Sequence, residues 1–248
     1  MDLKEFFRQH PKAAIAFSGG VDSSYLLYAA LQCGADVRAY YVKGAFQPQF
    51  ELDDAQRLAR DIHAPMTVLR ADVLRDETVT ANPANRCYYC KKVVFSSIAQ
   101  AALADGYTLL LDGTNASDDA GDRPGMRALQ ELQVLSPLRL CGLTKPEIRR
   151  LSKEARLFTW DKPAYACLAT RIPTGEKITA EKLSATESAE GELFAMGFTD
   201  FRVRWYAGAA RLQFPTVQLP RVLERREEIL TKLKKYYPAV LLDLEVRG

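Results

Sequence analysis

The stretch Ala13-Ala14-Ile15-Ala16-Phe17-Ser18-Gly19-Gly20-Val21-Asp22-Ser23 decides the fold of this chain. Its apolar first half predicts a short buried strand, and residues 23–31 predict a helix directly after the glycine turn. Free backbone amides and the positive end of the helix dipole meet at such a turn. Two adjacent glycines also let the backbone turn sharply and approach a ligand closely. The stretch therefore predicts an anion-binding loop between a strand and a helix.

Strand and helix patterns alternate on both sides of this loop. We predict further strands at 37–42, 66–69 and 108–111, and helices at 49–62, 87–103 and 144–156, the last opened by a Thr144–Glu147 capping box. Repeated strand–helix units favour a parallel sheet with helices on both faces. The sequence therefore predicts an α/β domain over residues 1–165, with the Rossmann-like doubly wound arrangement.

A smaller α+β region is predicted after the segment 158–177, which is rich in Pro, Gly and aromatic residues. Its predicted elements are a helix at 180–196, a hairpin at 201–206 and 210–214, a helix at 219–235 and a strand at 240–245. We therefore expect a second domain over residues 166–248, with a role in substrate binding or oligomerisation.

Composition and charge exclude several classes of protein. The 248 residues carry a formal net charge of +3, and no run of like charges could serve as a nucleic-acid arm. The charged start Met1–Glu5 does not match a signal peptide, and no apolar run is long enough to span a membrane. Five cysteines, an odd number, argue against a disulfide framework. We therefore expect a cytoplasmic protein that binds neither nucleic acid nor membrane.

The loop Ser18-Gly19-Gly20-Val21-Asp22-Ser23 matches neither the Walker A pattern nor G-x-G-x-x-G. It resembles the nucleotide loop of the PP-loop ATP pyrophosphatases, which cleave ATP to AMP and pyrophosphate while they adenylate a substrate. The resemblance implies that this loop holds the diphosphate end of ATP, with Asp22 orienting the loop or helping to hold Mg²⁺. Asp112-Gly113-Thr114-Asn115, at a predicted strand end, resembles the second active-site loop of that superfamily, although a plain tight turn would also fit.

The cysteines add a second kind of chemistry. Cys87 and Cys90 form a CxxC at the start of a predicted helix, where the helix N-terminus and basic neighbours lower thiol pKa values. A lone CxxC fits half a zinc site, a redox pair or two ligands of an iron–sulfur cluster. Cys167 lies in a predicted loop close to Arg171, which would lower its pKa. A buried structural thiol is the alternative for Cys167.

Taken together, these motifs resemble the LarE family of ATP-dependent sacrificial sulfur transferases over nearly the whole chain. The resemblance is carried by Ser18–Ser23, Arg86–Lys91, Asp112–Asn115, Cys167–Pro173 and Arg202–Arg204. It implies adenylation of a carboxylate of pyridinium-3,5-biscarboxylic acid mononucleotide, followed by sulfur insertion to give a thiocarboxylate. This reaction contributes to the nickel-pincer nucleotide, the cofactor of lactate racemase.

The family has two branches, which differ in the source of sulfur. In one branch a cysteine at the position of Cys167 gives up its own sulfur and becomes dehydroalanine. In the other branch three cysteines hold a 4Fe-4S cluster, and an extra sulfide on the open iron is transferred. Cys87, Cys90 and Cys167 resemble the three-cysteine branch, which we favour over self-sacrifice. The resemblance thus implies ATP, Mg²⁺ and the cluster as cofactors, with Asp22, Cys167 and Arg171 as catalytic residues.

Further site residues follow from the resemblance. Arg202 and Arg204 lie at i and i+2 of a predicted strand and resemble the site for the substrate phosphate, which bidentate arginines suit. A solvated strand face is the alternative for this pair. Glu190 resembles an acidic residue near the active site and is expected as a magnesium ligand. Relatives often carry an acidic residue where this chain has Gln213. A homo-oligomer is implied, and the sulfur donor is unidentified.

Three other functions are compatible with parts of the sequence. A tRNA thiolase also combines a PP-loop with cysteines, but the near-neutral charge and the lack of a recognisable RNA module argue against it. An amide-forming PP-loop synthetase would use the CxxC as a structural zinc half-site. A degenerate nucleotide-binding module could act as a sensor or scaffold, although the intact loop argues against this.

Overall fold

The computed structural model describes residues 1–118 and 124–247. The chain divides into two compact units. The first comprises Met1–Val73 and Asn85–Lys162, and the second runs from Pro163 to the C-terminus and includes Leu74–Ala84. The division falls close to the predicted boundary between residues 165 and 166, whereas the grouping of 74–84 with the second unit has no counterpart in the sequence pattern.

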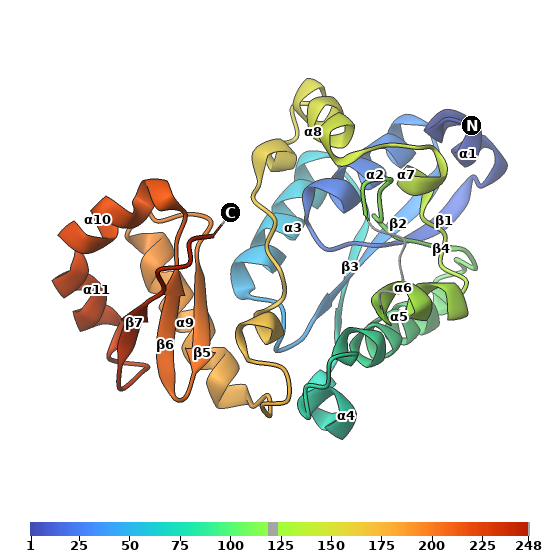
Figure 1. Ribbon diagram of the computed structural model, residues 1–248. Coiled ribbons are helices and arrows are strands. Elements are labelled where there is room, and N and C mark those ends of the chain that lie inside the picture. Colours follow the sequence, from blue (N-terminus) through green and yellow to red (C-terminus); the bar gives the residue numbers. More distant parts are fainter. Residues whose placement is uncertain (119–123, 248) are drawn as a thin grey trace. The chain divides into compact units, whose positions relative to one another are not determined.

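The first unit is built on a parallel sheet with the strand order β3-β2-β1-β4 (Figure 1). Its strands are β1 (Lys12–Ala16), β2 (Asp36–Lys43), β3 (Met66–Arg70) and β4 (Leu110–Leu111). Its helices are α1 (Leu3–Gln9), α2 (Val21–Gln32), α3 (Gln49–Asp61), α5 (Arg86–Ala104), α6 (Pro124–Glu131), α7 (Pro137–Leu140), α8 (Lys145–Glu154) and the 3₁₀ turn η2 (Phe158–Asp161). The predicted α/β class is thereby confirmed.

Helices cover both faces of this sheet because successive strand residues point to opposite sides. Ile15 packs with α2, α3 and α8 in one buried cluster. Its neighbour Ala14 packs with Phe95 and Ile98 of α5 and with Leu129 of α6 in another cluster. This explains why the strands read as continuous apolar runs in the sequence.

Two helix starts bear on the predicted site. α2 begins at Val21, two residues before the predicted start at residue 23, and its cap residue Gly20 makes no side-chain capping bond. α8 opens with the predicted capping box, in which the Thr144 side chain and the Glu147 carboxylate each bond to the other residue's backbone. Both starts lie near the nucleotide loop, since Lys145 at the start of α8 contacts Asp22 in the first turn of α2.

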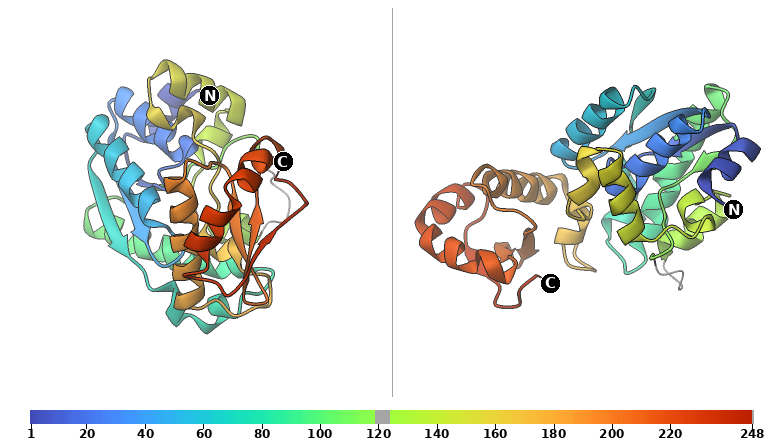
Figure 2. Two further views of the ribbon diagram at one scale, coloured as in Figure 1. Left: turned by 90° about the vertical axis from the view of Figure 1, so that its left-hand side faces the viewer. Right: turned by 90° about the horizontal axis from the view of Figure 1, so that it is seen from above.

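The second unit has a small mixed sheet with the order β5-β6-β7. β5 (Arg202–Tyr206) and β6 (Ala209–Gln213) form the predicted hairpin, and β7 (Val240–Leu242) pairs parallel to β6. Apolar residues of α9 (Ala180–Ala195), α10 (Leu219–Glu224) and α11 (Arg226–Leu233) join one buried cluster with this sheet. Figure 2 draws these helices and strands, coloured orange to red, from two further sides. The remaining elements are η1 (Val73–Arg75), α4 (Glu77–Thr80), η3 (Leu168–Arg171) and η4 (Thr216–Gln218).

The prediction of a single helix over 219–235 is wrong, because the segment forms two helices, α10 and α11. Arg225 leaves the helical region at φ −101° and ψ 18° and separates α10 from α11. Its guanidinium donates to the carbonyl of Met196, 2.6 Å away. This long-range contact is not encoded in the helical periodicity of the segment.

None of the helices in the described parts of the chain has the length and apolar character of a membrane span.

Candidate functional site

The loop Ser18–Ser23 lies at the carboxyl end of β1, where the sheet order changes direction between β1 and β4. Ligands of open α/β sheets bind at this switch point. The loop is braced internally, since Ser18 Oγ lies 3.1 Å from Ser23 Oγ and the Ser23 hydroxyl donates to Gly20 O at 3.3 Å. The sequence-predicted anion site therefore stands at the edge of the sheet where ligands bind.

Gly19 explains why this loop needs glycine. Its φ is +72°, in the left-handed region. An added Cβ would lie 3.0 Å from the Cβ of Ala55 on α3 and 3.3 Å from Glu51 O. α3 therefore packs closely against Gly19 and leaves no room for a side chain there.

The second predicted loop, Asp112–Asn115, contacts the first directly. An added Cβ at Gly113 would lie 2.8 Å from the backbone nitrogen of Ser23 and 3.0 Å from its Cα. No side chain other than hydrogen fits there. The structure thus brings the two sequence-predicted loops together around Ser23.

Asp112 and Asn115 shape the second loop. Asp112 is buried, and its carboxylate accepts from Ser136 Oγ at 2.6 Å and from Thr114 Oγ1 at 2.5 Å. Asn115 is also buried, and its Oδ1 accepts from the amide of Ser117 at 2.8 Å. These bonds hold the backbone of the loop, and Ser136 is a supporting residue that the sequence did not indicate.

Asp22 lies in the first turn of α2 and pairs with a lysine from α8. Lys145 Nζ donates to Asp22 Oδ2 at 2.5 Å. Burial raises the pKa of Asp22, and the hydrogen bond from Lys145 opposes this effect. The other carboxylate oxygen, Oδ1, is buried with no hydrogen-bond partner. An acceptor oxygen without a partner beside the predicted anion-binding loop fits a magnesium ligand, because Mg²⁺ prefers carboxylate oxygens.

Sequence reasoning identified Lys145 only as part of a capping box. The signal that could have revealed it is its position at the first residue of α8, since a cation is unfavourable at the positive end of a helix dipole. Its backbone N–H donates to Ser117 Oγ at 2.9 Å, which ties α8 to the segment that follows the second loop.

Pockets lie along the sheet of the first unit. One, of about 320 Å³, lies at the carboxyl ends of β2 and β3 and is lined by Lys43, Gly44, Arg70, Ala71 and Asp72. The strand ends approach closely there, since a Cβ on Gly44 would lie 2.8 Å from Ala71 O. It shares its sheet edge with the nucleotide loop.

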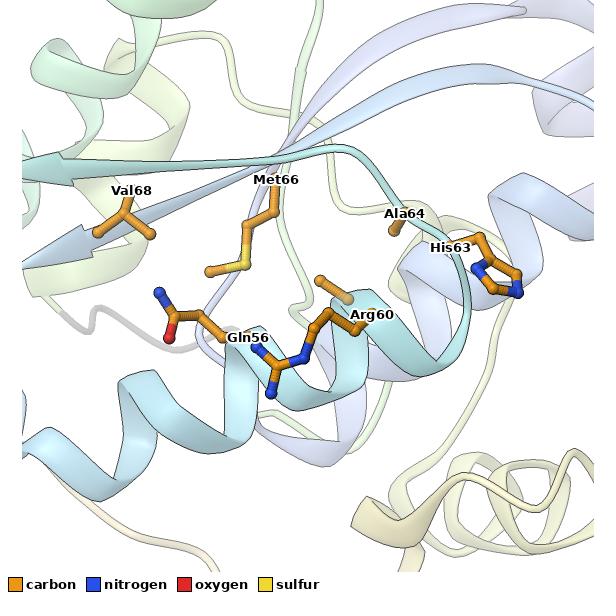
Figure 3. Close-up of a pocket in the computed structure, with 7 residues that line it drawn as sticks. Gln56, Arg60, His63, Ala64, Met66 and Val68 are labelled. Carbon is orange, nitrogen blue, oxygen red and sulfur yellow. The ribbon is translucent and has the colours of Figure 1, made fainter.

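Another pocket, of about 590 Å³, lies between α3 and the edge strand β3 (Figure 3). Met66 and Val68 project from β3 toward Gln56 and Arg60 of α3, and His63 lies beyond the end of that helix. None of the sequence-predicted site residues lines it.

Cys87 and Cys90 lie in the first two turns of α5, three residues apart and hence on one side of the helix. Cys87 is exposed and Cys90 is half-buried. The buried guanidinium of Arg86 reaches back to Cys87, with Nη2 3.6 Å from Sγ. Tyr88 anchors this turn to α6 through a hydrogen bond to Glu131 of 2.7 Å. Both thiols belong to the first unit.

The second unit contains Cys167, half-buried just before η3. Three arginines hold the segment around Cys167 by donating hydrogen bonds to its backbone carbonyls. Arg171 Nη1 donates to Ala166 O at 3.0 Å, Arg202 Nη2 to Ala164 O at 2.6 Å and Arg204 Nη1 to Thr170 O at 3.0 Å. The predicted residues Arg171, Arg202 and Arg204 are therefore brought together around the Cys167 segment.

The carboxylate of Glu190, on α9, lies against the segment around Cys167. Its Oε1 accepts from Arg171 Nε at 2.7 Å and from the amide of Val203 at 3.0 Å, and its Oε2 accepts from the Tyr165 hydroxyl. Arg171 and Glu190 are both about 1% exposed. The structure thus gives the carboxylate of Glu190 protein partners on both oxygens, and its predicted role as a magnesium ligand stays a prediction.

Arg202 and Arg204 both lie close to other arginines of the second unit. Burial, followed by the nearby charges of Arg171 and Arg247, lowers the pKa of Arg202 to about 10. Burial and like charges also lower the pKa of Arg204, which lies opposite Arg211 in the hairpin. Like charges at directly opposed positions repel. Such an arrangement is suited to an anionic ligand, as the predicted phosphate site requires.

Over residues 1–118 and 124–247, no group of three or more His, Cys, Asp or Glu side chains is placed to hold a metal ion. The predicted ligands are divided between the units, with Cys87 and Cys90 in the first and Cys167 in the second. The three-cysteine site therefore remains a prediction from the sequence.

No model of a protein family matches the chain. It is 36% identical to an uncharacterized protein of Synechocystis sp. over 98% of this chain and 92% of that protein. It is 30% identical to the pyridinium-3,5-bisthiocarboxylic acid mononucleotide synthase of Lactiplantibacillus plantarum, over 94% of this chain and 86% of that enzyme. A tRNA-specific 2-thiouridylase of Thermotoga neapolitana is 25% identical over 58% of this chain and 52% of its own length.

Proposed function

Because the chain belongs to the LarE-like family of PP-loop ATP pyrophosphatases, we propose that it is an ATP-dependent sulfurtransferase acting on a pyridinium mononucleotide. The proposed substrate is pyridinium-3,5-biscarboxylic acid mononucleotide, and the proposed product is its thiocarboxylate. The name of the Lactiplantibacillus relative supports this substrate, and its similarity extends over both units of this chain. We also expect a cytoplasmic homo-oligomer.

The observation that carries the proposal is the meeting of the two loops at Ser23. Amides of Ser18–Ser23 would bind the β- and γ-phosphates of ATP, and Gly113 allows the second loop to approach them. Asp22 would hold Mg²⁺ through Oδ1, which has no protein partner. The metal, when bound, would neutralise the charge that develops on the departing diphosphate.

The proposed reaction has two steps. A carboxylate oxygen of the substrate attacks the α-phosphorus of ATP, and the bond to the β-phosphate breaks to release pyrophosphate. A sulfur nucleophile then attacks the acyl carbon, and AMP leaves with the carboxylate oxygen. Adenylation is needed because an oxide ion is a poor leaving group, whereas AMP is a good one. Arg202 and Arg204 would bind the phosphate of the substrate during both steps.

The source of the sulfur is proposed from the cysteines. Cys87 and Cys90 on one side of α5 fit two cluster ligands, and Cys167 would be the third. Three thiolates leave one iron of a 4Fe-4S cluster open, and such an iron could carry the sulfide. In the alternative, the sulfur of Cys167 itself is transferred, and loss of the Cα proton with cleavage of the Cβ–S bond leaves dehydroalanine.

The test is a reaction under anaerobic conditions with ATP, magnesium and the pyridinium substrate. We expect AMP, pyrophosphate and a product whose mass reflects exchange of oxygen for sulfur. Iron should be present, with sulfide in excess of iron because the open iron carries an extra sulfide, and both should be lost in Cys87→Ala. A colourless protein that loses the mass of one hydrogen sulfide after turnover would support the sacrificial route. AMP formation that requires tRNA, and not the pyridinium compound, would contradict the proposed function.

A further inference from the structure

Lys145 occupies an unusual place for a lysine. It is the first residue of α8, whose N-terminal amides already carry a partial positive charge. The protein has 34 lysines and arginines, and such cations are generally more stable near a helix C-terminus than near a helix N-terminus. A specific partner must therefore offset the unfavourable position.

That partner is Asp22 of the nucleotide loop. The 2.5 Å contact joins Lys145 Nζ to Asp22 Oδ2 across 123 residues of sequence. The two side chains are 32% and 22% exposed, so the pair lies at the margin of the site and not in the core. The backbone of Lys145 is fixed by Ser117, whereas its ammonium is carried on a flexible side chain with several rotatable bonds.

The contact also has consequences for anion binding. A carboxylate in the first turn of α2 would repel a diphosphate held by the amides of the same turn, unless a cation separates the two. Lys145 already stands at Asp22, while Asp22 Oδ1 still lacks a partner. Asp22 therefore already binds one cation, the ammonium of Lys145, and keeps its Oδ1 for a second cation.

We infer that Lys145 is the exchangeable counter-cation of the nucleotide loop. It neutralises Asp22 while the loop is empty, and it turns to the diphosphate when a divalent metal binds Asp22. This inference rests on the proposed function, and it makes Lys145 a phosphate-binding residue that competes with the metal for Asp22. A purely structural ion pair would not contribute to the binding of metal-free pyrophosphate.

The inference is tested by binding of two separate probes to the full chain. Mn²⁺ alone is titrated by electron paramagnetic resonance, and pyrophosphate alone is titrated calorimetrically in the presence of a chelator. In Lys145→Met, Mn²⁺ should bind about threefold to tenfold more tightly because its competitor is gone. Pyrophosphate without metal should bind about tenfold or more weakly, because Asp22 loses its counter-cation and then repels the diphosphate.

Two further variants sharpen the test. Asp22→Asn should lose Mn²⁺ binding and bind metal-free pyrophosphate more tightly, which is the reverse of the effects at Lys145. Arg150→Met removes an exposed cation of the same helix, paired with Glu154, and should change neither affinity. Thermal unfolding of each variant shows whether it is folded, and Lys145→Arg should retain metal-free pyrophosphate binding if Lys145→Met is unstable.

Opposite changes of the two affinities support the inference. Unchanged affinities, or a parallel loss of both in folded Lys145→Met, would overturn it while ATP cleavage by the unaltered protein left the proposed function standing. An unaltered protein that binds neither ATP nor pyrophosphate, with or without metal, would refute the proposed function and this inference together.

Discussion

Replacing Gly113 by alanine adds one methyl group at the point where the two loops of the first unit meet. The new Cβ would lie 2.8 Å from Ser23 N, and ordinary contact begins at 3.4 Å, so the loops must separate by about 0.6 Å. The opposing atom is backbone and cannot rotate away. Overpacking of this kind costs about 1–3 kcal/mol. At about 2–4 °C per kcal/mol, the unfolding temperature should fall by about 2–12 °C.

Gly113→Ala should also bind ATP more weakly. A shift of the Ser23 amide displaces a donor that we assign to the phosphates, and loss of one hydrogen bond to a charged group weakens binding by about tenfold or more. Calorimetric titration with ATP and magnesium measures this affinity. Gly34→Ala is the matched control in the same unit, because Gly34 has φ +72° with no atom within 4 Å of an added Cβ. Its strain costs about 1–2 kcal/mol without touching the loop.

The two variants separate stability from binding. Gly34→Ala should be destabilised and bind ATP normally, whereas Gly113→Ala should lose both properties. Normal ATP affinity in a destabilised Gly113→Ala would show that the second loop is not part of the nucleotide site. An unchanged unfolding temperature would show that the loops are not packed as the structure has them.

Three other predictions concern the remaining parts of the protein. Arg171→Met leaves the Glu190 carboxylate buried without its cation and should cost about 3–5 kcal/mol in denaturant unfolding, whereas the double variant with Glu190→Gln should lose less. Arg204→Met should raise the KM for the pyridinium mononucleotide about tenfold in steady-state kinetics, with the KM for ATP unchanged. Hydrogen bonding to Tyr88 lowers the pKa of Glu131 from its ordinary 4.5 to about 2, so its contribution to stability is complete above pH 4.5 and is lost as the pH falls through 2. NMR titration should show this low pKa, and Tyr88→Phe should raise it.

The nucleotide loop could be predicted because everything that defines it is local. A buried strand, two glycines and the start of a helix follow one another within Ala13–Ser23, and backbone geometry alone places amides at the turn. The same holds for the capping box of α8 and for the CxxC on α5, whose spacing puts both thiols on one side of a helix. Periodicity also indicated the hairpin and the order of strands and helices.

Other features depend on contacts between distant segments. The break of the last predicted helix at Arg225 accompanies a bond to Met196, and the role of Glu190 depends on Arg171 and Tyr165 folding onto α9. No local pattern encodes such contacts, because the partners come close only after the chain has packed.

The sequence by itself thus determined the parallel α/β fold, the glycine loop and the family, since these follow from residue type at fixed short spacing. Only the tertiary structure decided that Gly113 touches Ser23, that Lys145 pairs with Asp22, and that three arginines hold the Cys167 segment. The physical reason is that the charge balance and close packing of a site depend on which distant segments the fold brings together. Helix and strand periodicity determines which face of an element is buried, but it does not specify the partner of a polar side chain on that element.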